Sequence, residues 1–153
     1  IIVLLMESKF NYKNFSIVIP IYNEEEILKE STNAIYTLCK STGVNFEIIF
    51  SENGSTDNTK IIAEKLIKKY SEIRIISNPE PNYGNALRAG FKTAKNDLVV
   101  SFDIDYYSES FLIEALSLEE KYSAITASKR LNSSEDGRRF VRRMATKFFV
   151  IIL

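Results

Sequence analysis

The chain has 153 residues, a length that suits a single domain with a substantial hydrophobic core. Its 20 basic and 20 acidic side chains cancel to a net charge of zero, and a hydrophobic content of 45% is ordinary for a globular protein. The sequence has no histidine, which excludes histidine-based triads and metal sites, and its single Cys39 excludes a disulfide framework and fits a reducing cytoplasm.

Short apolar segments alternate with segments of helical periodicity along the chain. The apolar segments predict strands at 15–19, 46–51, 73–77, 98–102 and 124–128, and the periodic segments predict helices over 27–38, 61–67, 86–94 and 111–118. Asn23 is the expected N-cap of the first helix. This order predicts an α/β fold with right-handed crossovers and a mostly parallel sheet, and the apolar early strands indicate helices on both faces.

A polar cluster follows each predicted strand, at 20–26, 52–59, 78–85, 103–105 and 129–130. Ligands of open α/β sheets bind outside the carboxyl ends of the strands, so these clusters are expected to meet at one rim. Asp103 and Asp105 leave the fourth strand at alternate positions, where both carboxylates can face one hard cation that holds a diphosphate. The first loop lacks glycine and is acidic, so it does not bind a pyrophosphate directly.

Two further residues at strand ends are candidates for ligand contact. Glu24 lies nearest to the end of the first strand, whereas Glu25 and Glu26 are explained by favourable charge at a helix N-terminus. Asn53 follows the second strand directly, where a base or a ribose can be recognised by hydrogen bonds.

Four motifs carry a resemblance to a known family. They are Val18-Ile19-Pro20-Ile21-Tyr22-Asn23-Glu24, Glu52-Asn53-Gly54-Ser55-Thr56-Asp57-Asn58-Thr59, Asn82-Tyr83-Gly84-Asn85-Ala86-Leu87 and Asp103-Ile104-Asp105. In this order and spacing the chain resembles the family 2 glycosyltransferases, and within them the dolichyl- or polyprenyl-phosphate mannose or glucose synthases. The resemblance implies a GT-A fold, a GDP- or UDP-sugar donor, Mg²⁺ or Mn²⁺, and inversion at the anomeric carbon.

The resemblance also implies roles for individual residues. Pro20, Tyr22 and Glu24 would line the nucleoside pocket, Ser51 and Asn53 would meet the base, and Asp103, Ile104 and Asp105 would hold the diphosphate and metal. Asp105 and Arg130 would be catalytic, with Arg130 neutralising the leaving diphosphate.

The chain departs from the family pattern at two of these motifs. Asn53 stands where the family has aspartate, which keeps a carbonyl acceptor for a base N–H but loses the charge, so base affinity or choice is expected to differ. Tyr107 stands where many lipid-phosphate synthases have glutamine as a further metal contact.

The predicted organisation has three segments. Residues 1–14 form an N-terminal extension, 15–130 the nucleotide-sugar-binding core, and 131–153 a basic and apolar tail that starts an acceptor-side region. The interval 129–147 has seven basic and two acidic residues, which suits phosphate groups or an anionic membrane surface, with a solvated or core helix as the alternative. The chain opens with an apolar run rather than methionine, and it stops inside the apolar run 148–153. These ends predict a fragment that is truncated at its C-terminus.

The function predicted from these features is sugar transfer from a nucleoside-diphosphate sugar to a polyprenyl or dolichyl phosphate or another acceptor. The expected location is the cytoplasm or the cytoplasmic face of a membrane, and no nucleic-acid partner is expected. One alternative is a non-catalytic or inactive sugar-nucleotide-binding domain. A second is a sugar-phosphate nucleotidyltransferase, which would be expected to carry a glycine-rich basic loop where this chain has 20–26.

Overall fold

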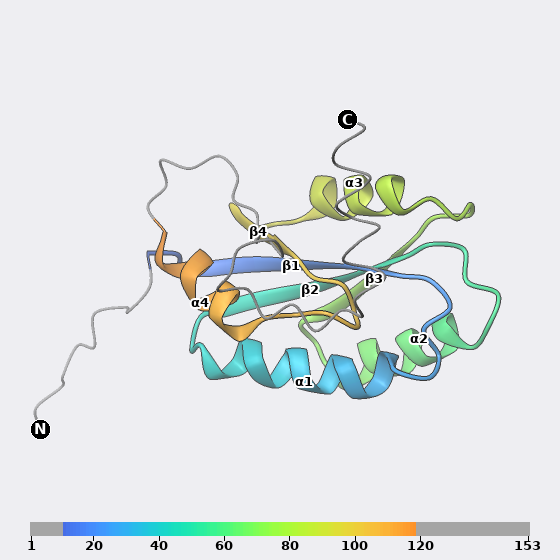
Figure 1. Cartoon of the computed structure of the whole chain (residues 1–153), viewed down its shortest axis with the longest axis horizontal. Coiled ribbons are helices and arrows are strands. Elements are labelled where there is room, and N and C mark those ends of the chain that lie inside the picture. The colour runs from blue at the N-terminus through green and yellow to red at the C-terminus, as the bar shows by residue number, and fades with distance from the viewer. Residues whose placement is uncertain (1–10, 119–153) are drawn as a thin grey trace, which may run out of the picture. The chain divides into compact units, whose positions relative to one another are not determined.

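The computed structural model describes residues 11–118, which form an α/β unit around a parallel sheet (Figure 1). Within this range the strands are β1 (Asn14–Ile21), β2 (Asn45–Glu52), β3 (Ile73–Ser77) and β4 (Leu98–Ser101), in the spatial order β3-β2-β1-β4. The helices are α1 (Leu28–Ser41), α2 (Thr59–Lys69), α3 (Tyr83–Thr93) and α4 (Glu109–Ser117). The first four predicted strands and the four predicted helices are thereby confirmed, and the strand expected at 124–128 lies outside the described residues.

All strand pairs are parallel, and β1 is buried from Phe15 to Ile21. Helices α1 and α2 cover one face of the sheet and α3 covers the other (Figure 1), which accounts for the lack of polar alternation in β1. The core on the α1 side includes the fully buried Phe15, Ile17 and Phe50. Burial of each such side chain contributes roughly 1.5–3 kcal/mol. None of the helices between residues 11 and 118 is long and apolar enough to cross a bilayer.

Cys39 belongs to this core. Its side chain is fully buried, and burial raises the pKa of the thiol to about 12. The thiol therefore stays protonated and inert at neutral pH, so Cys39 is a structural residue of the core.

Helix α3 packs unusually close to the sheet because it presents small residues to it. Ala86 and Gly90 are its buried residues, and a Cβ added to Gly90 would come closer to Cγ1 of Val18 than van der Waals contact permits. The buried hydroxyl of Ser51 donates a 2.7 Å hydrogen bond to the carbonyl oxygen of Ala86. These contacts fix the start of α3 beside the carboxyl ends of the strands.

The N-cap prediction for Asn23 is wrong. Helix α1 begins at Leu28 with Ile27 as N-cap, and the backbone N–H groups of both residues donate to the carbonyl oxygen of Glu24. Asn23 has a φ of 54°, a left-handed conformation that asparagine adopts more readily than most residues. Its side-chain oxygen accepts a hydrogen bond from the backbone N–H of Thr56 instead of capping a helix.

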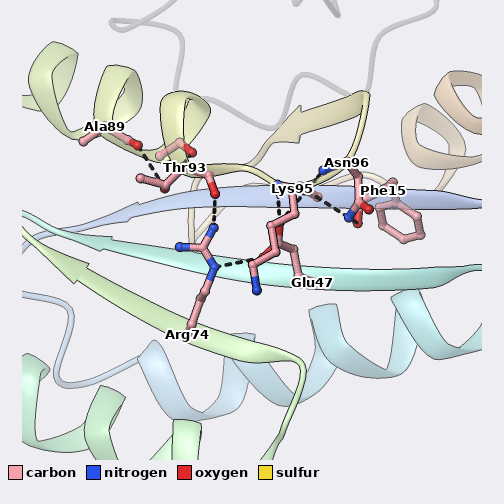
Figure 2. Close-up of polar contacts among 9 residues, drawn as sticks. Phe15, Glu47, Arg74, Ala89, Thr93, Lys95 and Asn96 are labelled. Atoms are coloured by element: carbon pink, nitrogen blue, oxygen red, sulfur yellow. Dashed lines mark hydrogen bonds and ion pairs between the residues drawn. The ribbon is translucent and has the colours of Figure 1, made fainter.

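A polar network ties the strands together at their amino edge. Glu47 accepts hydrogen bonds from Nε of Arg74 (2.9 Å), the hydroxyl of Ser16 (2.8 Å) and the backbone N–H of Lys95 (2.7 Å). Figure 2 shows Arg74 reaching from β3 to both Glu47 and the carbonyl oxygen of Thr93. The network joins β1, β2, β3 and the connection from α3 to β4.

The pKa of Glu47 reflects this network. Burial of the carboxylate by itself would raise the pKa, but the hydrogen bonds from Arg74, Lys95 and Ser16 outweigh it and hold the pKa below the ordinary 4.5. A carboxylate whose pKa is depressed by folding adds stability above its unfolded pKa, and that stability is lost as the pH falls through the folded pKa.

Glu47→Gln is expected to lower the free energy of unfolding by about 2 kcal/mol at pH 7, because two hydrogen bonds lose their charged acceptor and one donor faces an NH₂ group. The deficit should shrink as the pH falls below 4.5, since protonation then removes the same charge from the unmodified chain. Urea denaturation of both chains at pH 7 and at a pH below 4.5 measures this difference in the free energy of unfolding. Glu30→Gln, on the exposed face of α1, is the control and should change stability by less than about 0.5 kcal/mol. If Glu47→Gln lowers the free energy of unfolding equally at both pH values, the stabilisation does not come from the charge of Glu47.

Candidate nucleotide-sugar site

A pocket of about 120 Å³ lies at the carboxyl ends of the strands. It is lined by Pro20, Ile21, Tyr22, Glu24, Asn53, Tyr83, Asp103, Ile104 and Asp105. Seven of the eight site residues predicted within 11–118 are in this set; Ser51 is the exception. The strand-end clusters that follow β1, β2, β3 and β4 therefore meet, as their order in the sheet requires.

Asp103 and Asp105 are presented by a tight turn beyond β4. The backbone N–H of Tyr106 donates to the carbonyl oxygen of Asp103 (3.1 Å), and the two residues form an isolated antiparallel bridge. Ile104 is 2% exposed and anchors the turn in the core, while Asp105 is exposed. The two carboxylates thus sit on either side of a buried residue, although the strand itself ends at Ser101.

The pocket is acidic, and its lining contains no basic residue among those described. Glu24 shows the effect: burial of its carboxyl group, and then the negative charges of Asp105, Asp57 and Asp103, raise its pKa above the ordinary 4.5. A diphosphate placed here would be repelled unless a cation came with it. Within residues 11–118 no group of three or more acidic or cysteine side chains could hold a metal alone. The carboxylate oxygens of Asp103 and Asp105 nevertheless suit a hard divalent cation whose other ligands come from phosphate and water.

Two loops form the wall of the pocket around Glu24. The backbone N–H of Glu24 donates to the hydroxyl of Thr59 (2.7 Å), and that of Glu25 donates to the carboxylate of Asp57 (3.2 Å). In return, the backbone and side-chain N–H groups of Asn58 donate to the carboxylate of Glu25. Glu25 and Asp57 are therefore occupied in holding the loops together, and Glu24 is the acidic residue of the first loop that is left to line the pocket.

Asn53 is 5% exposed, and its side-chain oxygen accepts a 2.8 Å hydrogen bond from the backbone N–H of Asn82. The sequence suggested this carbonyl as an acceptor for a base N–H, but in the structure it is already paired. The amide nitrogen is the part of the side chain that has no partner among the described residues. Asn53 therefore offers a ligand the N–H donors of its amide, while one of the two lone pairs of its oxygen is already used.

Two other residues singled out in the sequence, Ser51 and Tyr107, do not line the pocket. Ser51 is fully buried, donates to the carbonyl oxygen of Ala86 and accepts from the side-chain nitrogen of Asn78 (3.2 Å). It therefore holds α3 and the loop after β3 in place and does not contact the pocket itself. Tyr107 packs against the core, with its ring centroid 6.5 Å from that of Phe102, and does not line the pocket. Arg130 and the basic interval 129–147 lie outside the described residues.

Tyr83 is a polar pocket residue to which the sequence assigned no role. It is the first residue of α3, and its phenol donates a 2.9 Å hydrogen bond to Oδ1 of Asp103. Partial burial and this contact with the Asp103 carboxylate raise the pKa of Tyr83 to about 12, so the phenol stays protonated. No sequence pattern reveals this contact, because it joins residues 20 positions apart.

A larger depression of about 310 Å³ lies at the opposite edge of the sheet, around Glu47, Glu72 and Arg74. Among its charged lining residues, Arg74 is paired with Glu47 at 2.9 Å and Glu72 with Lys40 at 2.6 Å, while Lys95 donates its backbone N–H to Glu47. The depression also lies at the amino ends of the strands, away from the converging loops. The smaller acidic pocket is therefore the candidate site.

Comparison with known proteins identifies the family of the chain. Residues 16–150 match the family described as Glycosyl transferase family 2. The chain is 30% identical over 146 residues to an undecaprenyl-phosphate 4-deoxy-4-formamido-L-arabinose transferase of Shewanella sediminis (strain HAW-EB3), covering 93% of this chain and 44% of that protein. It is 34% identical over 119 residues to the protein of the same name from Proteus mirabilis (strain HI4320), covering 75% and 36%. The chain thus spans less than half the length of these two relatives.

Solved structures share the fold. The mannosyltransferase PcManGT from Pyrobaculum calidifontis, in complex with GDP-Man and Mn²⁺, superposes with a TM-score of 0.57 at 20% identity, over 67% of this chain and 31% of that one. S. aureus TarS 1-349 in complex with UDP-GlcNAc gives a TM-score of 0.55 at 25% identity, over 67% and 30%. The predicted GT-A fold is confirmed. Because the family match extends over most of the chain and the fold agrees with it, the chain belongs to glycosyl transferase family 2.

Proposed function

We propose that this chain is the donor-binding part of a glycosyltransferase that moves a sugar from a GDP- or UDP-sugar to a polyprenyl phosphate. The observation that carries the proposal is the pocket at the strand ends, which has three carboxylates and no basic side chain among its lining residues. Such a pocket accepts a diphosphate only together with a divalent cation. The undecaprenyl-phosphate transferases among the relatives support the polyprenyl phosphate acceptor.

Asp103 and Asp105 would hold the cation, Mg²⁺ or Mn²⁺, through carboxylate oxygens. The bound ion would stabilise the negative charge of the departing nucleoside diphosphate. Pro20 and Tyr22 line the same pocket and would contact the nucleoside, with the exposed Tyr22 ring as a stacking surface. Arg130, by its resemblance to the family arginine, would add positive charge at the leaving group.

The acceptor chemistry requires little from the protein. A phosphate oxygen is already an anion at neutral pH, so it attacks the anomeric carbon without a general base, in a single displacement that inverts the configuration. The reaction is proposed to occur at the cytoplasmic face of a membrane, where the basic interval 129–147 would meet anionic lipid headgroups.

A second candidate is a domain that binds the sugar nucleotide without turning it over. It is favoured by one observation: Tyr107, at the position where the resemblance implies a further metal contact, packs against the core and does not line the pocket. Radiolabelled transfer to undecaprenyl phosphate distinguishes the two, since a binding domain would take up the donor and release it unchanged. Nucleotidyl transfer is disfavoured because the loop after β1 has neither glycine nor a basic residue.

The proposed function is tested by thermal unfolding of the chain with GDP, UDP or ADP, each with Mn²⁺ and with excess chelator. GDP or UDP at about 100 times its dissociation constant should raise the melting temperature by roughly 5–10 °C in the presence of Mn²⁺ and have little effect with chelator. ADP is the control for nonspecific diphosphate binding. Stabilisation that survives chelation, or that no nucleotide produces, would rule out a cation-dependent donor site here.

A further inference from the structure

Two consecutive residues at the start of α3 connect the two ends of the pocket. The backbone N–H of Asn82 donates to the side-chain oxygen of Asn53 (2.8 Å), and the phenol of Tyr83 donates to Oδ1 of Asp103 (2.9 Å). Asn82 also caps α3, since its side-chain oxygen accepts from the backbone N–H of Asn85 (3.0 Å). The base-side and the cation-side residues are therefore held by one helix N-terminus.

The position of that helix N-terminus is itself fixed. Gly90 lets α3 approach Val18 closely, and the Ser51 hydroxyl binds the Ala86 carbonyl oxygen from the sheet. Little room remains for α3 to slide, so the Tyr83 phenol reaches Asp103 from a defined direction.

The hydrogen bond determines what Asp103 can offer to a cation. The phenol occupies one lone pair of Oδ1 and fixes the orientation of the carboxylate, which favours coordination of a cation through Oδ2 alone over chelation by both oxygens. Small cations such as Mg²⁺ require near-octahedral geometry with short bonds, whereas Ca²⁺ takes more oxygens and often binds both oxygens of a carboxylate. Outer-shell hydrogen bonds of this kind orient metal ligands and commonly affect metal affinity 10–100-fold.

We propose that Tyr83 is a positioning residue of the donor site, which holds Asp103 in a one-oxygen binding mode and so favours a small divalent cation over Ca²⁺. The inference rests on the proposed function, in which Asp103 and Asp105 hold the cation of a nucleoside diphosphate complex. Tyr83 itself does not ligate the cation, and its contribution is the geometry of Asp103.

The test is Tyr83→Phe, which removes the phenol and keeps the ring. Calorimetric titration of MnCl₂ and of CaCl₂ into the 153-residue chain, with GDP or UDP present, gives both apparent affinities. The Mn²⁺ affinity should fall about 10-fold, the lower end of the usual range because the bond is exposed to solvent. The Ca²⁺ affinity should stay within about twofold, since a freed Oδ1 compensates by binding Ca²⁺ directly.

Tyr36→Phe is the matched control, because it removes the 3.0 Å hydrogen bond between another phenol and the carboxylate of Glu72 at the far edge of the sheet. It should leave both cation affinities unchanged. Equal losses for Mn²⁺ and Ca²⁺ in Tyr83→Phe, or no loss in either, would overturn the inference while the proposed function stands. If the unmodified chain binds neither nucleotide with either cation, the proposed function fails and the inference fails with it.

Discussion

Asp105→Ala is expected to weaken cation-dependent binding of GDP or UDP by more than about 100-fold, because loss of a direct ligand should exceed the effect of an outer-shell contact. The fold should be unaffected, since the side chain is exposed and has no hydrogen bond or ion pair with other described residues. Calorimetry with Mn²⁺ measures the affinity, and circular dichroism confirms the fold.

The control is Asp97→Ala, which removes an exposed carboxylate before β4, at the amino edge of the sheet. It alters the net charge by the same amount and should leave nucleotide binding unchanged. If the two variants bind equally well, Asp105 is not part of the cation site. If both lose affinity equally, the effect is one of overall charge and the site assignment is also lost.

Gly90→Ala is expected to destabilise the fold by overpacking the contact between α3 and β1. The new methyl group would overlap Cγ1 of Val18, a fully buried and stiff side chain, and overpacking of this kind costs about 1–3 kcal/mol. Alanine gains about 1 kcal/mol of helix propensity over glycine, which offsets part of that cost. We expect a net loss of up to about 2 kcal/mol in the free energy of unfolding by urea, together with weaker nucleotide binding as α3 carries Tyr83 away from Asp103.

Gly84→Ala provides the comparison within the same helix. A methyl group there meets the side-chain oxygen of Asn82 at 3.6 Å, an ordinary contact, so the propensity gain should leave stability unchanged or slightly higher. Val18→Ala in the Gly90→Ala background should recover part of the loss, which makes the double variant more stable than the sum of the single effects. Strict additivity would show that the two side chains do not compete for space.

The elements of the fold were predictable because their signals are local. Runs such as 46–51 are apolar and rich in β-branched or aromatic residues, and β2 extends beyond that prediction by one residue at each end. The meeting of Glu24, Asn53, Asp103 and Asp105 was also predictable, because parallel strands bring their carboxyl ends to one edge.

The sequence-based predictions were wrong or absent where a side chain forms a hydrogen bond with a residue far away in the sequence. Asn23 was expected to cap α1, but its oxygen pairs with Thr56, 33 residues away. The carbonyl of Asn53 pairs with the backbone N–H of Asn82, 29 residues away, a contact that the sequence did not indicate. Tyr83 pairs with Asp103, 20 residues away, from a helix whose Gly90 lies close to Val18 of the sheet. Such pairings depend on tertiary placement, which local periodicity does not encode.

The hydrogen bonds between the loop after β1 and the loop after β2 have a practical consequence for exchanging parts between relatives. Glu24 is held by Thr59, and Glu25 by Asp57 and Asn58, so neither loop keeps its shape when its partner is replaced. A chimera that imports one of these loops alone would carry donors and acceptors without counterparts. An exchange of the preference for a sugar nucleotide between this chain and a relative therefore requires that both loops be replaced together.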